Sequence, residues 1–192
     1  MPQPNQAALD FLLSRSSRPA KTLKTPVPTR DQLLPILTAA ARVPDHGKLV
    51  PWRFVVLERA ALLRLADLVR RLGPGLGIDP EKVEKSALNF GGSHLAVAVV
   101  FVPRDSEKVP EVEQLLSAGA ACFSLLNAAL ASGWGANWIT GWPSHDEGFC
   151  REGFGLAAGE KVAGIIHIGT ETSVPPERPR PDVAEITTWM TE

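Results

Sequence analysis

The sequence has only two cysteines in 192 residues, Cys122 and Cys150. Neither has another cysteine or a histidine at zinc-finger spacing, so the pattern predicts neither a disulfide framework nor a cysteine-based metal site. Unpaired cysteines of this kind are typical of a reducing compartment. We therefore expect a cytoplasmic protein.

Net charge is also nearly absent, because 20 Lys and Arg residues are balanced by 21 Asp and Glu residues, which leaves −1. Such a chain has no long-range field for capturing nucleic acid or an anionic membrane, although a local basic patch could still bind one phosphate. The N-terminal segment lacks the basic and apolar stretches of a signal peptide, and no window approaches the ~18–20 apolar residues of a membrane span. We expect a soluble protein with no nucleic-acid partner and no membrane partner.

Length and composition predict one packed domain over residues 1–192. Hydrophobic residues make up 44% of the chain and charged residues 21%, which is the composition of an ordinary globular protein. A single domain usually has roughly 100–200 residues, and a chain of this size buries about 70% of its unfolded surface. Disorder is therefore excluded.

Helical periodicity alternates with short apolar runs along the chain. The expected helices cover residues 8–13, 30–43, 59–72, 80–88 and 110–132. The expected strands cover residues 52–57, 95–102 and 162–169, with a short strand or loop at 138–140. The longest helix is apolar nearly all round, which predicts a buried central helix, and the strand at 95–102 does not alternate, so both its faces should be covered. Together these elements predict an α+β fold in which helices flank a small sheet of three to five strands.

The C-terminal residues 173–192 differ in character from the rest of the chain. Their first half is rich in proline, which excludes helix and sheet and favours a polyproline-like arm. Such an arm must lie along a surface, its own or a partner's. A short helix is expected after it at residues 182–190.

Sequence motifs that name a reaction are missing. The patterns G-x-x-x-x-G-K-[ST], H-E-x-x-H and G-x-S-x-G do not occur, and the glycine-rich segment at 73–77 follows a helix rather than a strand. The chain therefore has no phosphate loop, zinc-protease motif, nucleophile elbow or dinucleotide fingerprint.

Three polar clusters stand out instead: residues 15–18, Arg42 with Asp45, His46 and Lys48, and residues 137–140. Arginine and serine after a helix suit a phosphate ester, because guanidinium donates two charged hydrogen bonds while hydroxyl and N–H groups supply the rest. A purely structural interpretation stays open for each cluster, since surface arginine and serine need no ligand.

Several single residues leave the same two interpretations open. His46 could bind a ligand or act as a general acid, or it could be a structural residue of its loop. Asp45 could orient an imidazole, but a turn former is the simpler interpretation. Tryptophans could line an aromatic cofactor pocket or fill the core. These tryptophans are Trp134, Trp138 and Trp142. For His94 and His167 a core or strand-end position is the simpler interpretation.

Five short motifs follow one another in a specific order. They are Arg15-Ser16-Ser17, Arg42-Val43-Pro44-Asp45-His46 with Pro51-Trp52, Ser117-Ala118-Gly119, Trp138-Ile139-Thr140-Gly141 and Ile168-Gly169-Thr170. In this order and spacing they resemble the FMN-dependent nitroreductase family, and most closely its small single-domain NAD(P)H nitroreductase branch. The resemblance runs from about residue 7 to about residue 172.

This resemblance implies a nitroreductase-like fold, with a small, mostly antiparallel sheet, flanking helices and a long central helix. It also implies a homodimer with FMN bound at the subunit interface. The implied FMN contacts, taken from the matching positions, are Arg15, Ser16, Ser17, Arg42, His46, Trp138, Ile139, Thr140 and Arg180.

Two positions depart from the family pattern. Ser16 replaces the middle arginine of an Arg-Arg-Ser run, which makes Arg18 a candidate substitute. Val50 stands where a glutamine often precedes the Pro-Trp pair, so a polar contact to the flavin ring is absent. In many family members a C-terminal arginine reaches the FMN phosphate, and Arg180, rather than Arg178, is the expected counterpart.

The implied activity passes hydride from NADH or NADPH through flavin N5 to a small planar acceptor, such as a nitroaromatic or a quinone, in ping-pong fashion. Because the cofactor performs this chemistry, we expect no catalytic side chain and no metal in the protein. Several cations and one N–H donor would favour the reduced, anionic flavin, and Arg15, Arg42 and His46 are the candidates for these groups. Two alternatives stay open: a non-catalytic flavin-binding or storage protein, and another flavin chemistry on the same fold, such as desaturation or flavin fragmentation.

Overall fold

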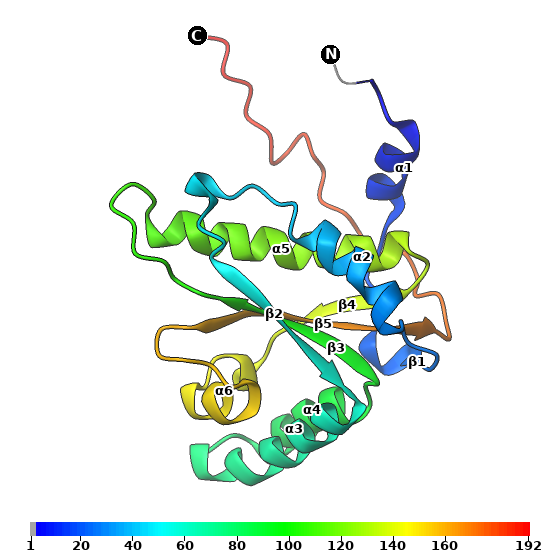
Figure 1. Cartoon of the computed structure of the whole chain (residues 1–192). Coiled ribbons are helices and arrows are strands. Elements are labelled where there is room, and N and C mark those ends of the chain that lie inside the picture. Colours follow the sequence, from blue (N-terminus) through cyan, green and yellow to red (C-terminus); the bar gives the residue numbers. More distant parts are fainter. Residues whose placement is uncertain (1–2) are drawn as a thin grey trace.

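The computed structural model describes residues 3–192 and arranges them in three layers (Figure 1). One antiparallel sheet forms the middle layer. Helices α2 (Arg30–Ala40) and α5 (Glu111–Ala131) cover one face of the sheet. The other face is covered by α3 (Arg59–Leu72), α4 (Pro80–Gly91) and α6 (Glu147–Phe154). The expected α+β architecture with its long central helix is confirmed.

The sheet is organised around β5 (Lys161–Glu171). This strand pairs antiparallel with β3 (Leu95–Phe101), with β4 (Gly135–Ile139) and with β1 (Leu23–Lys24). β2 (Trp52–Glu58) pairs antiparallel with β3. All 7 residues of β3 are buried, as its lack of alternation predicted. Each strand pair is antiparallel, so the sheet matches the expected type.

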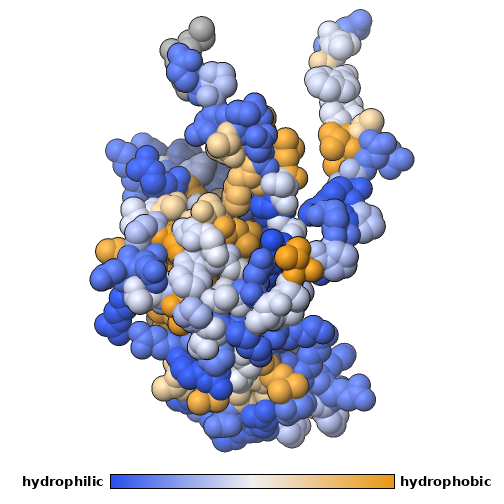
Figure 2. All heavy atoms as spheres, turned by 90° about the vertical axis from the view of Figure 1, so that its right-hand side faces the viewer, coloured by the Kyte–Doolittle hydropathy of each residue, from blue (hydrophilic) through white to orange (hydrophobic). Residues whose placement is uncertain are grey.

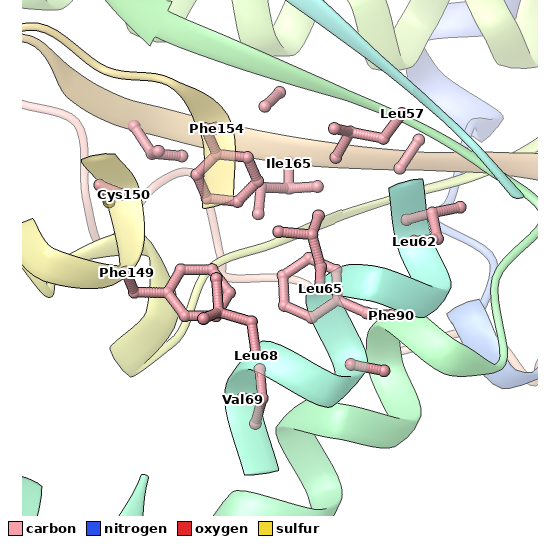
Figure 3. Close-up of a cluster of buried hydrophobic side chains, with 14 of the residues drawn as sticks. Leu57, Leu62, Leu65, Leu68, Val69, Phe90, Phe149, Cys150, Phe154 and Ile165 are labelled. Atoms are coloured by element: carbon pink, nitrogen blue, oxygen red, sulfur yellow. The ribbon is translucent and has the colours of Figure 1, made fainter. Parts of the chain in front are cut away.

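Two hydrophobic clusters fix the sheet between its helices. The cluster on the α3 side includes Leu65, Phe90 and Phe149, which lie close together in Figure 3. The cluster on the α5 side includes Leu125 and Ile166. Burial of a side chain of this size contributes about 1.5–3 kcal/mol, so the two clusters provide the rigid support for the loops at the ends of the strands.

Capping residues set the helix boundaries. Thr29 and Gln32 form a capping box at the start of α2. The helix ends at Ala40, three residues before the expected end at residue 43. Helix α6 was not predicted from the sequence, although Asp146 caps it by accepting a hydrogen bond from the Phe149 N–H. Its short length and internal glycines hide the helical periodicity.

Helix α5 corrects one expectation from the sequence. Its length and apolar composition are those of a membrane-spanning helix, so the statement that no segment approaches a span is wrong. One side of α5 packs against the sheet, where Ala121 and Leu125 are fully buried. Leu116 and Phe123 remain 68% and 47% exposed on the side away from the sheet. The apolar composition of α5 is thus explained by the core on one side and leaves an uncovered apolar face on the other.

Both ends of the chain project on the α5 side of the molecule (Figure 1). Helix α1 (Gln6–Ser14) has no buried residue, and Leu13 is 77% exposed. Residues 172–192 form neither helix nor strand, and a turn at 183–186 replaces the helix expected at 182–190. So short a helix is unstable without a surface to pack against, and Trp189 is 85% exposed. Figure 2 shows hydrophobic atoms along both projecting ends and on the body below the N-terminal one.

Candidate functional site

The loop at residues 15–18 lies against the edge of β4. The backbone N–H of Arg18 donates to the carbonyl of Ala136 at 2.8 Å. The Arg18 guanidinium pairs with Glu171 at the end of β5 and also donates to Ser16 Oγ. The structure therefore brings together two of the three polar clusters, residues 15–18 and residues 137–140.

Arg15 is a partly buried cation with an unused donor. Its Nη2 donates to Ser17 Oγ at 3.1 Å, but its Nε is buried and has no hydrogen-bond partner within residues 3–192. Burial lowers the pKa of Arg15, the nearby charges of Arg180 and then Arg18 lower it further, and Glu177 opposes them. Arginines gathered around an unsatisfied donor form an arrangement that an anion would stabilise.

Arg180 reaches this cluster from the C-terminal arm. Its guanidinium pairs with Glu177 at 2.7 Å, and its charge is close enough to lower the pKa of Arg15. Arg180 therefore lies close to Arg15, and its contact with the FMN phosphate stays a prediction. Arg18 is already engaged by Glu171 and Ser16, so its guanidinium holds the loop in place.

Strand β4 presents an open backbone edge beside the arginines. The Ala136 carbonyl faces away from β5, because it accepts the Arg18 N–H. In an antiparallel strand every second residue directs its N–H and C=O to the same side. The backbone groups of Trp138 therefore also face outward, where a planar ligand can hydrogen-bond to them.

The side chains of residues 138–140 lie on two sides of the sheet. The Trp138 indole covers Gly164 of β5, where an added Cβ would come within 2.1 Å of the indole nitrogen. Ile139 and Thr140 line a cavity of about 20 Å³ on the α4 side together with His167. The contacts of these three residues with FMN stay a prediction.

His46 lies near the opposite end of α5, whereas Arg42 lies beside the middle of that helix, because Ser124 donates to the Ala39 carbonyl before it and Ser117 donates to the Pro44 carbonyl after it. His46 Nδ1 is 2.8 Å from Glu113 Oε2 in the first turn of that helix. The 15–18 loop, in contrast, contacts β4, which follows the last turn of α5. Helix α5 has 21 residues, so it is roughly 30 Å long at 1.5 Å per residue. Within one chain, His46 therefore lies apart from the Arg15 cluster, and we call these two groups of candidate residues half-sites.

Two carboxylates beside His46 have different roles, and only that of Asp45 was expected from the sequence. Asp45 accepts hydrogen bonds from the N–H groups of Leu49 and Val50 at 3.1 and 2.8 Å, which supports its interpretation as a turn former. The His46 ring is held by Glu113 instead. The sequence held one hint that Glu113 has a polar partner, because its carboxylate lies in the first turn of a largely apolar helix.

The remaining histidine and tryptophan candidates lie in or beside the hydrophobic core. His167 is fully buried with Nδ1 at 2.9 Å from Ser93 Oγ, and burial lowers its pKa to about 4. His94 precedes β3, and burial lowers its pKa as well. Trp134 and Trp138 pack against the α5-side cluster, and Trp142 packs against the opposite one. The core or strand-end interpretation of the two histidines is therefore confirmed, and Trp138, although it packs against the core, also lies on the candidate site strand.

Residues 14–170 match the Nitroreductase family, and the chain therefore belongs to the nitroreductase family. The Escherichia coli K12 protein YdjA, provisionally named as an NAD(P)H nitroreductase, is 34% identical over 163 residues, which cover 85% of this chain and 87% of that protein. These matches confirm both the resemblance and the expected enzyme class.

Solved structures show the same fold. A nitroreductase-like family protein from Bacillus cereus superposes with a TM-score of 0.75 at 21% identity over 100% of both chains. A nitroreductase with bound FMN from Bacteroides fragilis gives a TM-score of 0.74 at 18% identity over 97% of this chain and 100% of that chain. The nitroreductase-like fold class is confirmed.

Proposed function

We propose that this chain is an FMN-dependent oxidoreductase that transfers hydride from NADH or NADPH to a small planar acceptor, a nitroaromatic or a quinone. The observation that carries the proposal is Arg15, whose buried Nε lacks a partner within residues 3–192 beside Arg18 and Arg180. A phosphate monoester has the charge and the acceptor atoms that this cluster lacks. The name of YdjA and the FMN bound in the Bacteroides fragilis structure support the same cofactor and co-substrate.

The residues present fit FMN on physical grounds. Arg15 and Arg180 would hold the phosphate, with Ser16 and Ser17 on the same loop. The outward backbone of Trp138, followed by Ile139 and Thr140, would face the ring. FMN supplies the hydride chemistry at N5 when it is bound, so the protein has to bind it, orient it and exclude water.

A second copy of the chain would complete the site. The outer face of α5 exposes Leu116 and Phe123, and an apolar face of this kind is typical of a subunit interface. An obligate homodimer interface commonly buries more than about 2,000 Å². In such a dimer Arg42 and His46 of one subunit would approach the Arg15 cluster of the other, with the C-terminal arm lying across the neighbour.

The spectrum of the purified protein tests the proposal. We expect a yellow protein with about one FMN per subunit, bleached by NADH or NADPH without oxygen and restored by air or by an added nitroaromatic or quinone. A colourless protein that does not take up added FMN would contradict the cofactor. Bound FMN that neither nucleotide bleaches would favour the storage protein instead. The ping-pong order, the cytoplasmic location and the choice between the two nucleotides stay predictions.

A further inference from the structure

The loop after His46 has an unusual left-handed backbone. The φ angles of Gly47, Lys48 and Val50 are 71°, 55° and 49°. Glycine adopts this conformation readily, but it is unfavourable for other residues, above all for a β-branched one such as valine. A loop that keeps two such residues left-handed must be held by its surroundings.

Asp45 supplies the hydrogen bonds that hold this backbone. Leu49 is right-handed, with φ −76° and ψ −19°, and Val50 after it is left-handed. A right-handed residue followed by a left-handed one makes successive N–H groups converge on a small concavity that binds an anion. The Asp45 carboxylate occupies it, accepting from the Leu49 and Val50 N–H groups at 3.1 and 2.8 Å.

Further contacts anchor both ends of the loop. The buried hydroxyl of Ser117 on α5 donates to the Pro44 carbonyl at 2.7 Å and accepts from Trp52 Nε1 at 3.2 Å. Arg104 donates to the Val50 carbonyl at 3.3 Å. The loop is thus fixed within the chain itself, before any ligand arrives.

The His46 ring is oriented by the same framework. A carboxylate only accepts hydrogen bonds, so Nδ1 must donate to Glu113, at 2.8 Å. Nε2 is therefore the ring nitrogen that a ligand would meet, and the ring is 61% exposed. The loop presents an oriented imidazole on a pre-formed backbone.

We propose that Asp45 is a positioning residue for the cofactor. Its carboxylate holds the loop in which Gly47, Lys48 and Val50 are left-handed, and so presents His46, with Arg42 at the start of the same loop, for cofactor binding. This inference rests on the proposed function, because both residues are predicted FMN contacts. A loop that is already ordered does not have to lose conformational freedom on binding, and the affinity for the ligand is higher for that reason.

The substitution Asp45→Asn tests the proposal, because it keeps the size of the side chain and removes its charge. Apo-protein is titrated with FMN, and binding is followed by quenching of flavin fluorescence. We expect the Kd to rise roughly tenfold, which corresponds to weakened hydrogen bonds to a charged group. Asp105→Asn changes an exposed carboxylate of another loop and should leave the Kd unchanged.

The substitution Val50→Gly separates positioning from simple stabilisation. Glycine is left-handed without strain, so the double variant Asp45→Asn/Val50→Gly should keep the loop geometry and regain most of the lost FMN affinity. The Val50→Gly single variant completes the double-mutant cycle.

Three outcomes would overturn the proposal. If Asp45→Asn unfolds at lower denaturant concentration but binds FMN like the wild type, the residue is only structural. If the double variant binds as weakly as Asp45→Asn, loop geometry is not what was lost. If the wild type itself fails to bind FMN, the proposed function falls together with this inference, whereas the first two results leave the proposed function intact.

Discussion

Arg15 is a side chain that is unfavourably placed in the free chain and well placed for an anion. Its Nε is buried without an acceptor within residues 3–192, and Arg18 and Arg180 repel its charge. A buried donor without a partner is destabilising. The residue therefore contributes little to the stability of the apo-protein, and its expected benefit appears only with a phosphate bound.

The substitution Arg15→Met should have opposite effects on stability and binding. It keeps the aliphatic packing but removes the repelled charge, so the free energy of unfolding of the apo-protein should stay constant or rise. FMN affinity should fall by about 1.5–3 kcal/mol, the usual contribution of a charged hydrogen bond. Denaturant unfolding and FMN titration measure the two quantities. Arg30→Met, which removes an exposed ion pair with Glu58, is the control, and equal FMN binding by both variants would remove Arg15 from the site.

His167 should make the stability of the fold depend on pH. Burial lowers its pKa to about 4, while a histidine in the unfolded chain titrates near ~6.5. Between these values the unfolded chain binds a proton that the folded chain excludes, so the free energy of unfolding falls as the pH drops from about 6.5 to about 4. His167 alone should account for about 2 kcal/mol between pH 7 and pH 5.

Urea unfolding at the two pH values measures this contribution. His167→Gln keeps a hydrogen-bonding side chain beside Ser93 and should lose most of the difference between pH 7 and pH 5. His145→Gln changes an exposed histidine and should retain it. The same pH dependence in wild type and His167→Gln would show that the buried imidazole is not the source.

Among the elements, β4 and β5 together form the support of the candidate site. β4 pairs with β5 from Gly135 to Ile139, and the Trp138 indole fits over the bare backbone of Gly164. The position of the indole thus depends on a glycine, which has no side chain, at position 164 of the neighbouring strand. The outward backbone groups of Trp138 depend on the same packing.

The substitution Gly164→Ala should disturb this support. Its Cβ would lie 2.1 Å from the indole nitrogen, so the indole must move. Overpacking of this kind destabilises a fold by about 1–3 kcal/mol, and FMN affinity should fall with it. Near-ultraviolet circular dichroism reports the moved indole, denaturant unfolding reports the loss of stability, and FMN titration reports the affinity. Gly75→Ala adds a methyl group in open space and should be close to neutral, so an equal response from the two variants would contradict the packing argument.

The elements that could be predicted from the sequence are those with a strong local pattern. β3 is continuously apolar and α5 is long, and both were found. β1 is only 2 residues long and is defined by its pairing with the end of β5, which leaves no local pattern. The helix expected at 182–190 was wrong because local propensity without a packing surface does not make a stable helix.

The candidate site was predicted only through the family resemblance, for a physical reason. Arg15 and Arg180 come from opposite ends of the chain and meet at β4 only in the folded molecule. Glu113 and His46 are 67 positions apart, so no spacing pattern links them. Asp45 was correctly interpreted as a turn former because its hydrogen bonds are local.

At the scale of the whole molecule, the two half-sites of one chain are separated by α5. The helix places His46 near its first turn and the Arg15 cluster beyond its last. If the half-sites act together, they must come from two different chains. The uncovered outer face of α5 is the surface through which two chains would meet.

Mixed dimers should test this arrangement directly. We expect Arg15→Met and Arg42→Ala each to bind FMN weakly as homodimers. Co-expression of the two variants should restore wild-type affinity at about one quarter of the sites, because half of the randomly paired dimers contain one intact composite site. FMN titration of the purified mixture measures this fraction. No tightly binding fraction would contradict a shared site.

If the proposed dimer forms through α5, the substitution Phe123→Lys should yield a monomer that no longer retains FMN. Phe123 is 47% exposed on the outer face of α5, and a charge buried in an apolar interface is strongly unfavourable. Sedimentation at low protein concentration measures the mass, and absorbance measures the flavin. Leu63→Lys alters a residue that is 44% exposed on α3, in the opposite layer, and should remain dimeric. A Phe123→Lys monomer that keeps FMN would refute the interface site.

The central position of β5 has a consequence for how the chain is made. β5 is the last strand in the sequence, yet β1, β3 and β4 all pair with it. β3 can pair with β2 earlier, but in a growing polypeptide its other edge and the pairing edge of β4 stay unpaired until β5 has been synthesised. Unpaired apolar edges of this kind promote association between incomplete chains. The nascent protein cannot complete its sheet from the N-terminal end, so it depends most on protection during the last part of its translation.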